Sequence, residues 1–297
     1  MSETKSITAV TNGQGKQLRR FAEDAVDGAI DDGLLDKDGA QNLIENGDEF
    51  KADIIASIKK HSLSNQYAHE EVESSYAYPK GYKVKGITEQ TNILRQLFPG
   101  IGFADEKLAE QPLPPNAEGW FAIPKWQSVG KTYGEALQRV LDLIEQTRNG
   151  VFHNYCKGRL GANYLRKHER TQKKLEALGE AQKGYDILVV PAQFGLRHRG
   201  RSVRRAREIF LTNEFGLGSY EVGIMILTHP ERLMNYDDLW IDCAGDEFAP
   251  FGGDFHDVPY FSFGGGFGGR VRFDTLWFDD ANEFYGSASA FLPPDLL

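Results

Sequence analysis

The chain has 297 residues, of which 40% are hydrophobic and 26% are charged, as is ordinary for a globular protein with a sizeable core. Its net charge of −9 argues against bulk binding to nucleic acid, so any polyanion site has to be a local patch. No stretch reaches the roughly 20 apolar residues that cross a bilayer, and no secretory signal is visible. With only two cysteines, these features predict a cytoplasmic protein without a membrane partner.

Residues 1–15 are expected to be a disordered leader, and residues 16–62 a module of three short helices. Apolar residues from Leu18 to Ile30 recur at helical spacing. Asp38 and Asp48 are expected to cap the second and third helices.

This helical module is strongly acidic. Eleven Asp and Glu residues lie between Glu23 and Asp53, against two basic residues, Lys37 and Lys51. DNA-reading helices need a basic surface, so the composition favours a role in solubility or protein contact over a helix-turn-helix DNA reader.

Residues 63–130 are rich in Tyr, Pro and Gly and are expected to be an irregular connecting region. Residues 131–148 carry an amphipathic helical pattern, for which Thr132 is a suitable N-cap with Glu135 three positions on. A second, more polar helix is expected over residues 162–182.

A mixed α/β domain is expected over residues 131–297, and the fold class predicted for the chain is α+β or α/β. Short apolar runs predict four strands, with a helix between the first two, which suggests a βαβ-like unit. The glycine-rich segment near the C-terminus is expected to form a hairpin tip. The predicted strands are 187–190, 222–227, 239–243 and 271–278, the helix is 202–213 and the tip is 264–269.

The strongest local signal is an arginine turn, which we define as residues 193–207. Six of the seventeen arginines of the chain lie within residues 197–207, at the start of a predicted helix. The helix dipole disfavours positive charge there, whereas it attracts anions together with the free N–H groups. The arginine turn is therefore predicted to bind phosphate or another polyanion, such as nucleic acid or a nucleotide. The proposed anion-binding residues are Arg197, Arg199, Arg201, Ser202, Arg204 and Arg205, with His198 as a candidate proton-transfer group.

The alternative is that these arginines pair with carboxylates of the same chain. Arg204 could pair with Glu208 at i, i+4. The acidic residues from 237 to 247 could also face the arginine turn. The density of arginine indicates that an anion is met, but not which one.

Three of these acidic residues, Asp242, Asp246 and Glu247, are candidates for a catalytic Mg²⁺ site of the phosphoryl-transfer type. A charge pair with the arginine turn is the favoured interpretation of Asp242. Hence no metal is predicted with certainty, and Mg²⁺ is left open as the cofactor.

The two cysteines allow a further, less favoured interpretation. Cys156 and His153 have a spacing that a metal could use, and together with Cys243 and His256 they could form a zinc site. Two separate cysteines are more often buried apolar residues.

Three segments together resemble a family of uncharacterised proteins from uncultured bacterial lineages. The resemblance covers most of the chain after about residue 60. No activity, cofactor or catalytic residue is assigned to that family, so the resemblance implies no function. The three segments are Glu118–Pro124, Pro191–Arg201 and Tyr236–Glu247.

Three functions remain open from the sequence. The first is a polyanion-binding module, which uses the arginine turn. The second is a metal-dependent phosphoryl-transfer or nuclease enzyme, and whether the chain is an enzyme at all is undecided. The third is a structural protein that forms homo-oligomers by docking the acidic module on the arginine turn of another copy.

Overall fold

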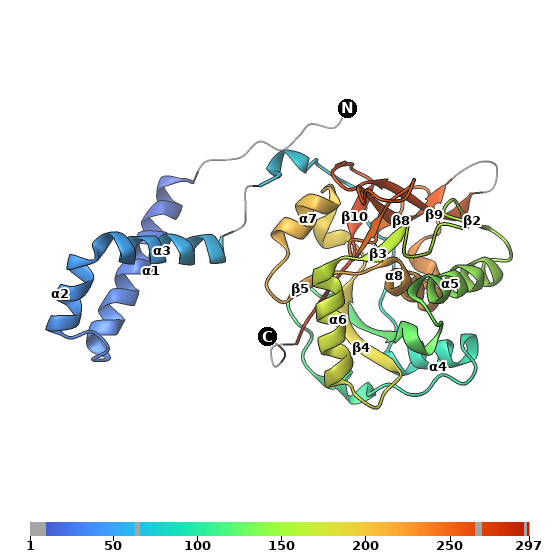
Figure 1. The fold of residues 1–297 in the computed structure, drawn as a ribbon, viewed down its shortest axis with the longest axis horizontal. Coiled ribbons are helices and arrows are strands. Elements are labelled where there is room, and N and C mark those ends of the chain that lie inside the picture. Colours follow the sequence, from blue (N-terminus) through green and yellow to red (C-terminus); the bar gives the residue numbers. More distant parts are fainter. Residues whose placement is uncertain (1–9, 63–65, 265–268, 294–295, 297) are drawn as a thin grey trace. The chain divides into compact units, whose positions relative to one another are not determined.

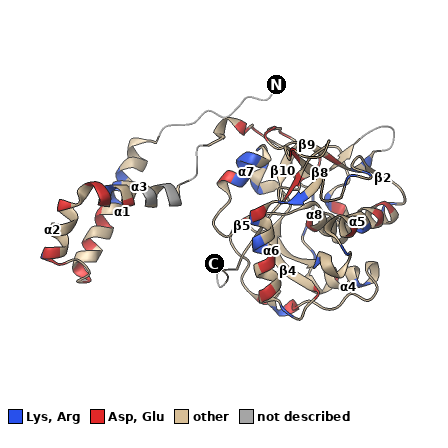
Figure 2. Ribbon diagram, viewed as in Figure 1, with Lys and Arg blue, Asp and Glu red and all other residues tan. Residues whose placement is uncertain are grey.

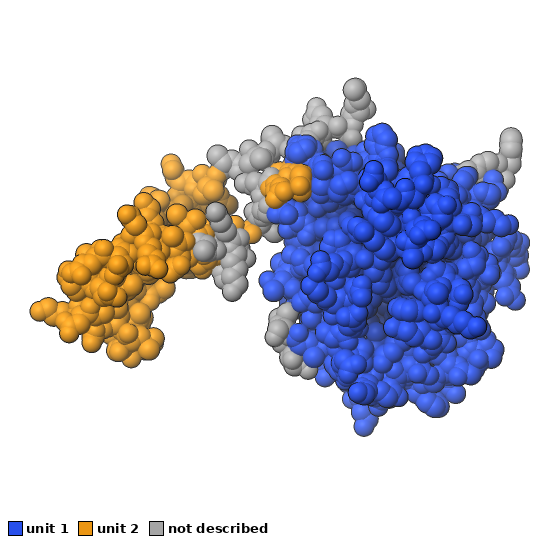
Figure 3. All heavy atoms as spheres, viewed as in Figure 1, with its two compact units in different colours: residues 1–5, 69–297 blue, residues 6–68 orange. Residues whose placement is uncertain are grey.

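The computed structural model describes residues 10–62, 66–264, 269–293 and 296. The chain divides into two compact units, residues 6–68 and residues 69–297 together with 1–5, which Figure 3 colours separately. The expected leader, residues 1–15, lies mostly outside the described residues, but its last part is helical.

The first unit contains three helices. Thr11 caps the first of them by accepting a hydrogen bond from the backbone N–H of Gln14 at 3.3 Å. The second helix is capped by Asp36 rather than Asp38, and Asn46 rather than Asp48 precedes the third, so both expected caps were wrong by two residues. The helices are α1 (Asn12–Asp31), α2 (Lys37–Glu45) and α3 (Gly47–His61).

The second unit has a mixture of helices and two sheets, which confirms the α+β class (Figure 1). Its helices are α4 (Ile87–Leu97), α5 (Tyr133–Thr147), α6 (Glu169–Ala181), α7 (Val203–Ile209) and α8 (Ser219–Thr228). The short 3-10 helix η1 (Ala68–Glu70) begins at the last residue of the first unit, and those of the second unit are η2 (Glu106–Glu110), η3 (Trp126–Ser128), η4 (Leu196–His198) and η5 (Pro230–Arg232).

The first sheet has four strands in the order β1-β4-β11-β5. β11 is antiparallel to both β4 and β5, so β4 and β5 run in the same direction with β11 between them. The segment β4–α7–β5 is therefore the expected βαβ-like unit, although its second strand is not the predicted one. The strands are β1 (Gly119–Pro124), β4 (Ile187–Gln193), β5 (Glu214–Gly216) and β11 (Ser289–Phe291).

The second sheet has seven strands, and β8 is its centre. β6 and β7 pair with one edge of β8, while β9 forms the long antiparallel hairpin with it. This hairpin confirms the expectation for the C-terminal region, although residues 265–268 of its tip lie outside the described residues. The strands are β2 (Phe152–Asn154), β3 (Leu165–Lys167), β6 (Trp240–Asp242), β7 (Asp246–Phe248), β8 (Asp257–Gly264), β9 (Arg270–Trp277) and β10 (Tyr285–Ser287).

Three sequence expectations fail after residue 62. Residues 222–227, expected to be a strand, belong to α8, because a helix that is buried on all sides reads as a continuous apolar run. Residues 63–130, expected to be irregular, contain α4 and β1, and β1 pairs with β4 from Gly119 to Pro124. The predicted helix 162–182 begins only at Glu169, after β3.

Helix α8 lies at the centre of the core, where it packs against α5 and β1. Gly223 allows this packing, because a Cβ atom there would lie 2.6 Å from Cγ1 of Val140 on α5. The same position faces Phe261 of β8, so α8 touches elements of both sheets. Burial of α8 also brings its N-terminus into the interior, where the candidate site lies.

Candidate functional site

The arginine turn is neutralised mainly by carboxylates from η1 and the residue after it. Glu71 pairs with Nε of Arg205 at 2.6 Å and with Nε of Arg201 at 3.2 Å. Glu70 pairs with Arg204, and it also accepts a hydrogen bond from Oγ of Ser202 at 2.6 Å. Glu70 and Glu71 are both buried. Burial raises the pKa of Glu71, but Arg205 and Arg201 outweigh it and hold that pKa below its usual value.

A second carboxylate, Glu214 of β5, neutralises the beginning of the turn. It accepts hydrogen bonds from Arg197 at 3.1 Å, from Nε2 of His198 at 2.7 Å and from Ser289 at 2.7 Å. Burial opposes ionisation of Glu214, but these donors bring its pKa to about 2. Burial lowers the pKa of His198, while the neighbouring Glu214 acts in the opposite direction. The hydrogen bond with Glu214 gives His198 a structural role.

The two remaining arginines of the turn differ. Arg207 donates to the backbone oxygens of Ala244 and Asp246, and it lies 4.0 Å from Glu247. Arg199 is exposed and donates to the carbonyl oxygen of Tyr76, with no carboxylate within 4.0 Å among the described residues.

Most arginines of the turn are therefore paired with carboxylates of the same chain, as the alternative interpretation held, although the carboxylates differ from those expected. Arg204 pairs with Glu70 and, at 3.4 Å, with Asp279, and Asp246 and Glu247 meet the turn through Arg207. Helix α7 has seven residues, and Ser202 caps it through the N–H of Arg205. Polyanion binding stays a prediction that no comparison tests, and the geometry does not favour it.

The three candidate metal ligands do not converge. Asp242 is buried on β6, Asp246 bonds to Tyr133 and Ser219, and Glu247 pairs with Arg166 at 2.7 Å. Within the described part of the chain, no three His, Cys, Asp or Glu residues form a metal-binding group. Among the described residues, these three weak candidates therefore do not form a group that could hold Mg²⁺.

The four zinc ligands considered from the sequence likewise do not form a metal-binding group among the described residues. Cys156 and Cys243 are both free and buried. Burial raises the pKa of Cys156 to about 12 and that of Cys243 well above its usual value. Neither thiol is thus activated as a nucleophile.

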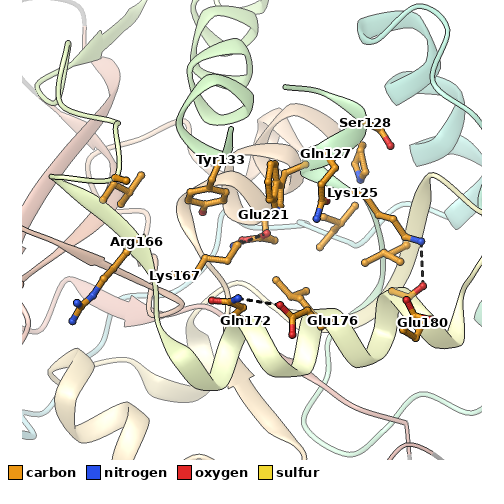
Figure 4. A pocket seen from close by; sticks show the side chains of 18 residues that line it. Lys125, Gln127, Ser128, Tyr133, Arg166, Lys167, Gln172, Glu176, Glu180 and Glu221 are labelled. Atoms are coloured by element: carbon orange, nitrogen blue, oxygen red, sulfur yellow. Dashed lines mark hydrogen bonds and ion pairs between the residues drawn. The ribbon is translucent and has the colours of Figure 1, made fainter. Parts of the chain in front are cut away.

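The structure instead presents a cavity of about 740 Å³ between β1, η3 and α6. That volume suits a small organic molecule. Figure 4 shows α6 along one side, with Gln172, Glu176 and Glu180 directed toward the cavity. The apolar and aromatic lining residues are Ile123, Pro124, Trp126, Tyr133, Ala162, Leu165, Leu175 and Leu188.

A buried ion pair lies at the wall of this cavity. Nζ of Lys167 donates to both carboxylate oxygens of Glu221, at 2.8 and 2.7 Å (Figure 4). The side chains are 10% and 3% exposed. The ammonium group also lies 4.2 Å from the ring centroid of Tyr133, a cation–π contact. An ammonium group has three donors, and the bonds to Glu221 use two of them.

The first turn of α8 holds this pair in place. Gly218 donates its backbone N–H to Glu221 at 3.1 Å, and Ser219 donates its own to Asp246 at 2.7 Å. Only glycine fits at 218, because a Cβ atom would lie 2.4 Å from Oδ1 of Asp246. Lys167 pairs in register with Asp246 across β3 and β7, so the backbone fixes where the lysine enters the cavity.

Tyr133 connects the cavity to the same turn. Its hydroxyl donates to Asp246 at 2.8 Å and accepts the N–H of Tyr220 at 3.3 Å. Burial, with the nearby charges of Asp246 and Glu221, raises the pKa of Tyr133 well above its usual value. Burial likewise raises the pKa of Asp246. The phenol therefore stays protonated and serves as an aromatic wall rather than a base.

Lys125 supplies a second ammonium group at the opposite end of the cavity. Its Nζ donates to the backbone oxygens of Gly179 at 3.1 Å and of Gln182 at 3.4 Å, at the end of α6. The ring of Trp126 meets that of Tyr133 edge to face at 6.3 Å. The cavity thus combines apolar walls with a few fixed polar groups, the usual composition of a ligand site.

Comparison of the chain with protein-family models, with curated proteins and with solved structures found no match. The resemblance stated from the sequence thus stays a prediction. No described helix combines the length and the apolar character that crossing a membrane requires.

The sequence pointed to none of the three central groups of the cavity, Tyr133, Lys167 and Glu221. They lie on α5, β3 and α8, separated by more than thirty residues in each case. The one available signal was Glu221 within an otherwise apolar run, where a charged residue needs a partner.

Proposed function

We propose that this protein binds a small organic molecule in the cavity between β1, η3 and α6. The observation that carries the proposal is the ion pair of Lys167 and Glu221, held almost without exposure at the wall of a 740 Å³ cavity. A buried charge pair is costly to desolvate, and replacing it with apolar residues is often neutral or stabilising. Ligand recognition would explain why this ion pair lies beside an open cavity.

The lining indicates the class of ligand. Trp126, Tyr133 and the leucines suit a flat apolar body, and the ammonium group of Lys167 suits an oxygen acceptor. Glu221 already neutralises Lys167, so recognition relies on hydrogen bonding more than on net charge. We expect an aromatic molecule that carries a carbonyl or carboxylate oxygen.

Binding accounts for the site better than catalysis does. Tyr133 is held protonated, and both thiols of the chain are buried with raised pKa values. No metal-binding group of three residues exists in the described part of the chain. The cavity offers donors and walls, but no activated nucleophile among these groups.

The test uses benzoate, 1-naphthoate and indole-3-acetate as probes, with binding followed by ligand-observed NMR and calorimetry. At least one probe is expected to bind with a Kd below about 1 mM. Leu175→Trp, which fills the cavity, should abolish binding. The double variant Lys167→Met/Glu221→Gln keeps the side-chain volumes and should weaken it at least about tenfold.

The matched control is Lys173→Met on the solvent side of α6, where the lysine is 70% exposed and pairs with Glu169. It should leave binding unchanged. Absence of binding by every probe, or binding that survives Leu175→Trp, would count against the proposed site.

A further inference from the structure

The cavity of the second unit is lined by charged side chains of both signs. Three of its lining residues are cationic and three are acidic, so their formal charges cancel. Helix α6, which borders the cavity, likewise carries three basic and three acidic residues (Figure 2). The cavity therefore has no formal net charge that would attract a charged ligand. The charged lining residues are Lys125, Arg166, Lys167, Glu176, Glu180 and Glu221.

The two neighbouring cations of β3 are each neutralised by a carboxylate. Lys167 is bonded to Glu221, and both side chains are buried at the cavity wall (Figure 4). Nε of Arg166 pairs with Glu247 at 2.7 Å, and Glu247 does not belong to the cavity lining. Neither cation is therefore an open positive charge for a carboxylate of a ligand.

Lys125 differs, because no carboxylate lies within 4.0 Å of it in the described part of the chain. Its ammonium group donates to the backbone oxygens of Gly179 at 3.1 Å and of Gln182 at 3.4 Å, at the C-terminal end of α6. The negative end of a helix dipole stabilises a cation at this position. The end of the helix thus takes the place of a counter-ion for Lys125.

The acidic residues of α6 line the cavity from exposed positions. Glu180 pairs with Lys183 at 3.7 Å, and Glu176 accepts a hydrogen bond from Gln172 at 3.0 Å. Glu176 and Glu180 are both exposed, so water and salt screen their charges. These two carboxylates therefore do not draw a cation into the buried part of the cavity.

The charges directly behind the wall also balance. Asp246 accepts a hydrogen bond from the hydroxyl of Tyr133, which lines the cavity. Arg207 donates to the backbone oxygen of Asp246 at 2.7 Å, so one cation accompanies this carboxylate. The pairing inside the wall thus repeats the balance of the lining.

A ligand with a net charge gains little in such a cavity. An ion that leaves water has to be paired and hydrogen-bonded, because burial of an unpaired charge is costly. A ligand carboxylate would also be repelled by the carboxylate of Glu221. An uncharged polar group avoids both costs.

Glu221 indicates which uncharged group fits. Its side chain lines the cavity and is 3% exposed. Among the described residues, Oε1 of Glu221 accepts one hydrogen bond, from Nζ of Lys167 at 2.8 Å. A carboxylate oxygen has two lone pairs, so Oε1 can accept a second hydrogen bond. An N–H group of a ligand would satisfy this buried acceptor.

We propose that the cavity binds an uncharged aromatic carboxamide, an inference that rests on the proposed function. The aromatic ring packs against the walls formed by Trp126 and Tyr133, and an N–H of the amide donates to Glu221. Of the carbonyl and carboxylate ligands expected above, this selects the neutral carbonyl and adds a hydrogen-bond donor.

The test compares four naphthalene derivatives by calorimetry with the full chain at pH 7. 1-Naphthamide is neutral and has an N–H donor, methyl 1-naphthoate is neutral and has none, 1-naphthoate is negative and 1-naphthylmethylamine is positive. The amide should bind at least about tenfold tighter than either charged probe. It should bind about threefold to tenfold tighter than the ester, which is the effect of one hydrogen bond.

The variant Glu221→Gln should change the selectivity in a defined direction. It leaves Lys167 without its carboxylate, so the affinity of 1-naphthoate relative to 1-naphthamide should rise about tenfold or more. The matched control is Glu169→Gln, which removes the same charge at a 79% exposed position of α6 and should leave this ratio unchanged. Circular dichroism verifies that each variant is folded, and the comparison of probes on the unaltered chain depends on no variant.

The outcomes separate this inference from the proposed function. Tighter or equal binding of a charged probe, compared with 1-naphthamide, would overturn the inference while the cavity remains a ligand site. If Lys125→Met then removed the binding of 1-naphthoate, Lys125 would be the residue that selects an anion. Equal affinity for the amide and the ester would overturn the role of Glu221 as acceptor. Absence of binding by all four probes would contradict the proposed function and the inference together.

Discussion

The buried pair of Lys167 and Glu221 allows a direct test of how the cavity wall is held together. In Lys167→Met the apolar stem is kept, but the ammonium group is lost and Glu221 stays in the interior. Among the described residues, Glu221 then retains the hydrogen bond from the backbone N–H of Gly218, at 3.1 Å. Breaking a buried ion pair by removing one partner costs about 3–5 kcal/mol. With exposures of 10% and 3%, this pair belongs at the buried end of the scale.

A loss of 3–5 kcal/mol lowers the folding equilibrium constant by about two to nearly four orders of magnitude. It is a large part of the roughly 5–15 kcal/mol that stabilises a domain. The double variant Lys167→Met/Glu221→Gln removes both charges at similar volume, so most of this loss should be recovered. The comparison of the single and double variants separates the cost of a stranded carboxylate from the cost of altered packing.

The assay is urea unfolding followed by tryptophan fluorescence. All four tryptophans, Trp120, Trp126, Trp240 and Trp277, belong to the second unit, so the signal reports on that unit alone. A deficit below about 1 kcal/mol, or an equal deficit in the single and double variants at pH 7, would refute the reasoning.

Three further predictions follow from other buried groups of the second unit. Asp242 is 1% exposed, and burial, together with the charge of Asp280, raises its pKa well above the usual value, so its ionisation opposes folding as the pH rises through that pKa. In urea unfolding, Asp242→Asn should therefore stabilise the protein by about 1–3 kcal/mol at pH 8 and by little at pH 4, whereas Asp254→Asn, at an exposed position, should leave the stability unchanged. Arg205 and Arg201 lower the pKa of Glu71, so the ion pairs of Glu71 stabilise the folded state above the pKa of the unfolded chain, and this stabilisation is lost as the pH falls through the pKa of the folded state. Glu71→Gln should cost about 3 kcal/mol of folding free energy at pH 7 and less at acidic pH, and an unchanged urea midpoint would contradict this. Gly223→Ala would place a Cβ atom 2.6 Å from a methyl carbon of α5 and should lower the Tm at a cost of about 1–3 kcal/mol, although alanine favours helices.

Local sequence signals were reliable where one element's own residues decide its structure. Thr132 caps α5 as expected, by accepting the N–H of Glu135 at 3.2 Å, and the apolar stripe of α5 faces the core. The run from Ile187 is a strand, and Gly264 and Arg270, on either side of the residues outside the description, pair at the end of the β8–β9 hairpin. In each case, caps, turns and periodicity act within a few residues of one another.

The same signals failed where burial is complete. Helix α8 has apolar residues on every side, so its sequence carries no period that distinguishes it from a buried strand. Strand β1 was missed for a related reason, because its residues include Pro124 and Gly119 and its pairing with β4 comes from about seventy residues away. Only packing against neighbours distinguishes these cases.

The arginine turn shows the limit for a candidate site. Its density indicated that anions are met, and five of its six arginines lie within 4.0 Å of a carboxylate of the same chain. Which anions these are depended on Glu70 and Glu71, more than 120 residues earlier in the chain, and on Glu214. Long-range pairing of side chains leaves no trace in local spacing.

By itself, the sequence determined the class of fold, the acidic character of the N-terminal helices and the presence of a strong charge cluster, because composition and short-range periodicity carry this information. The tertiary structure alone decided that the charge cluster is satisfied internally and that Lys167, Glu221 and Tyr133 meet at a cavity. These groups come together because β3 pairs with β7 and α8 is buried between α5 and the sheets. A site assembled from separate elements exists only once the core has formed.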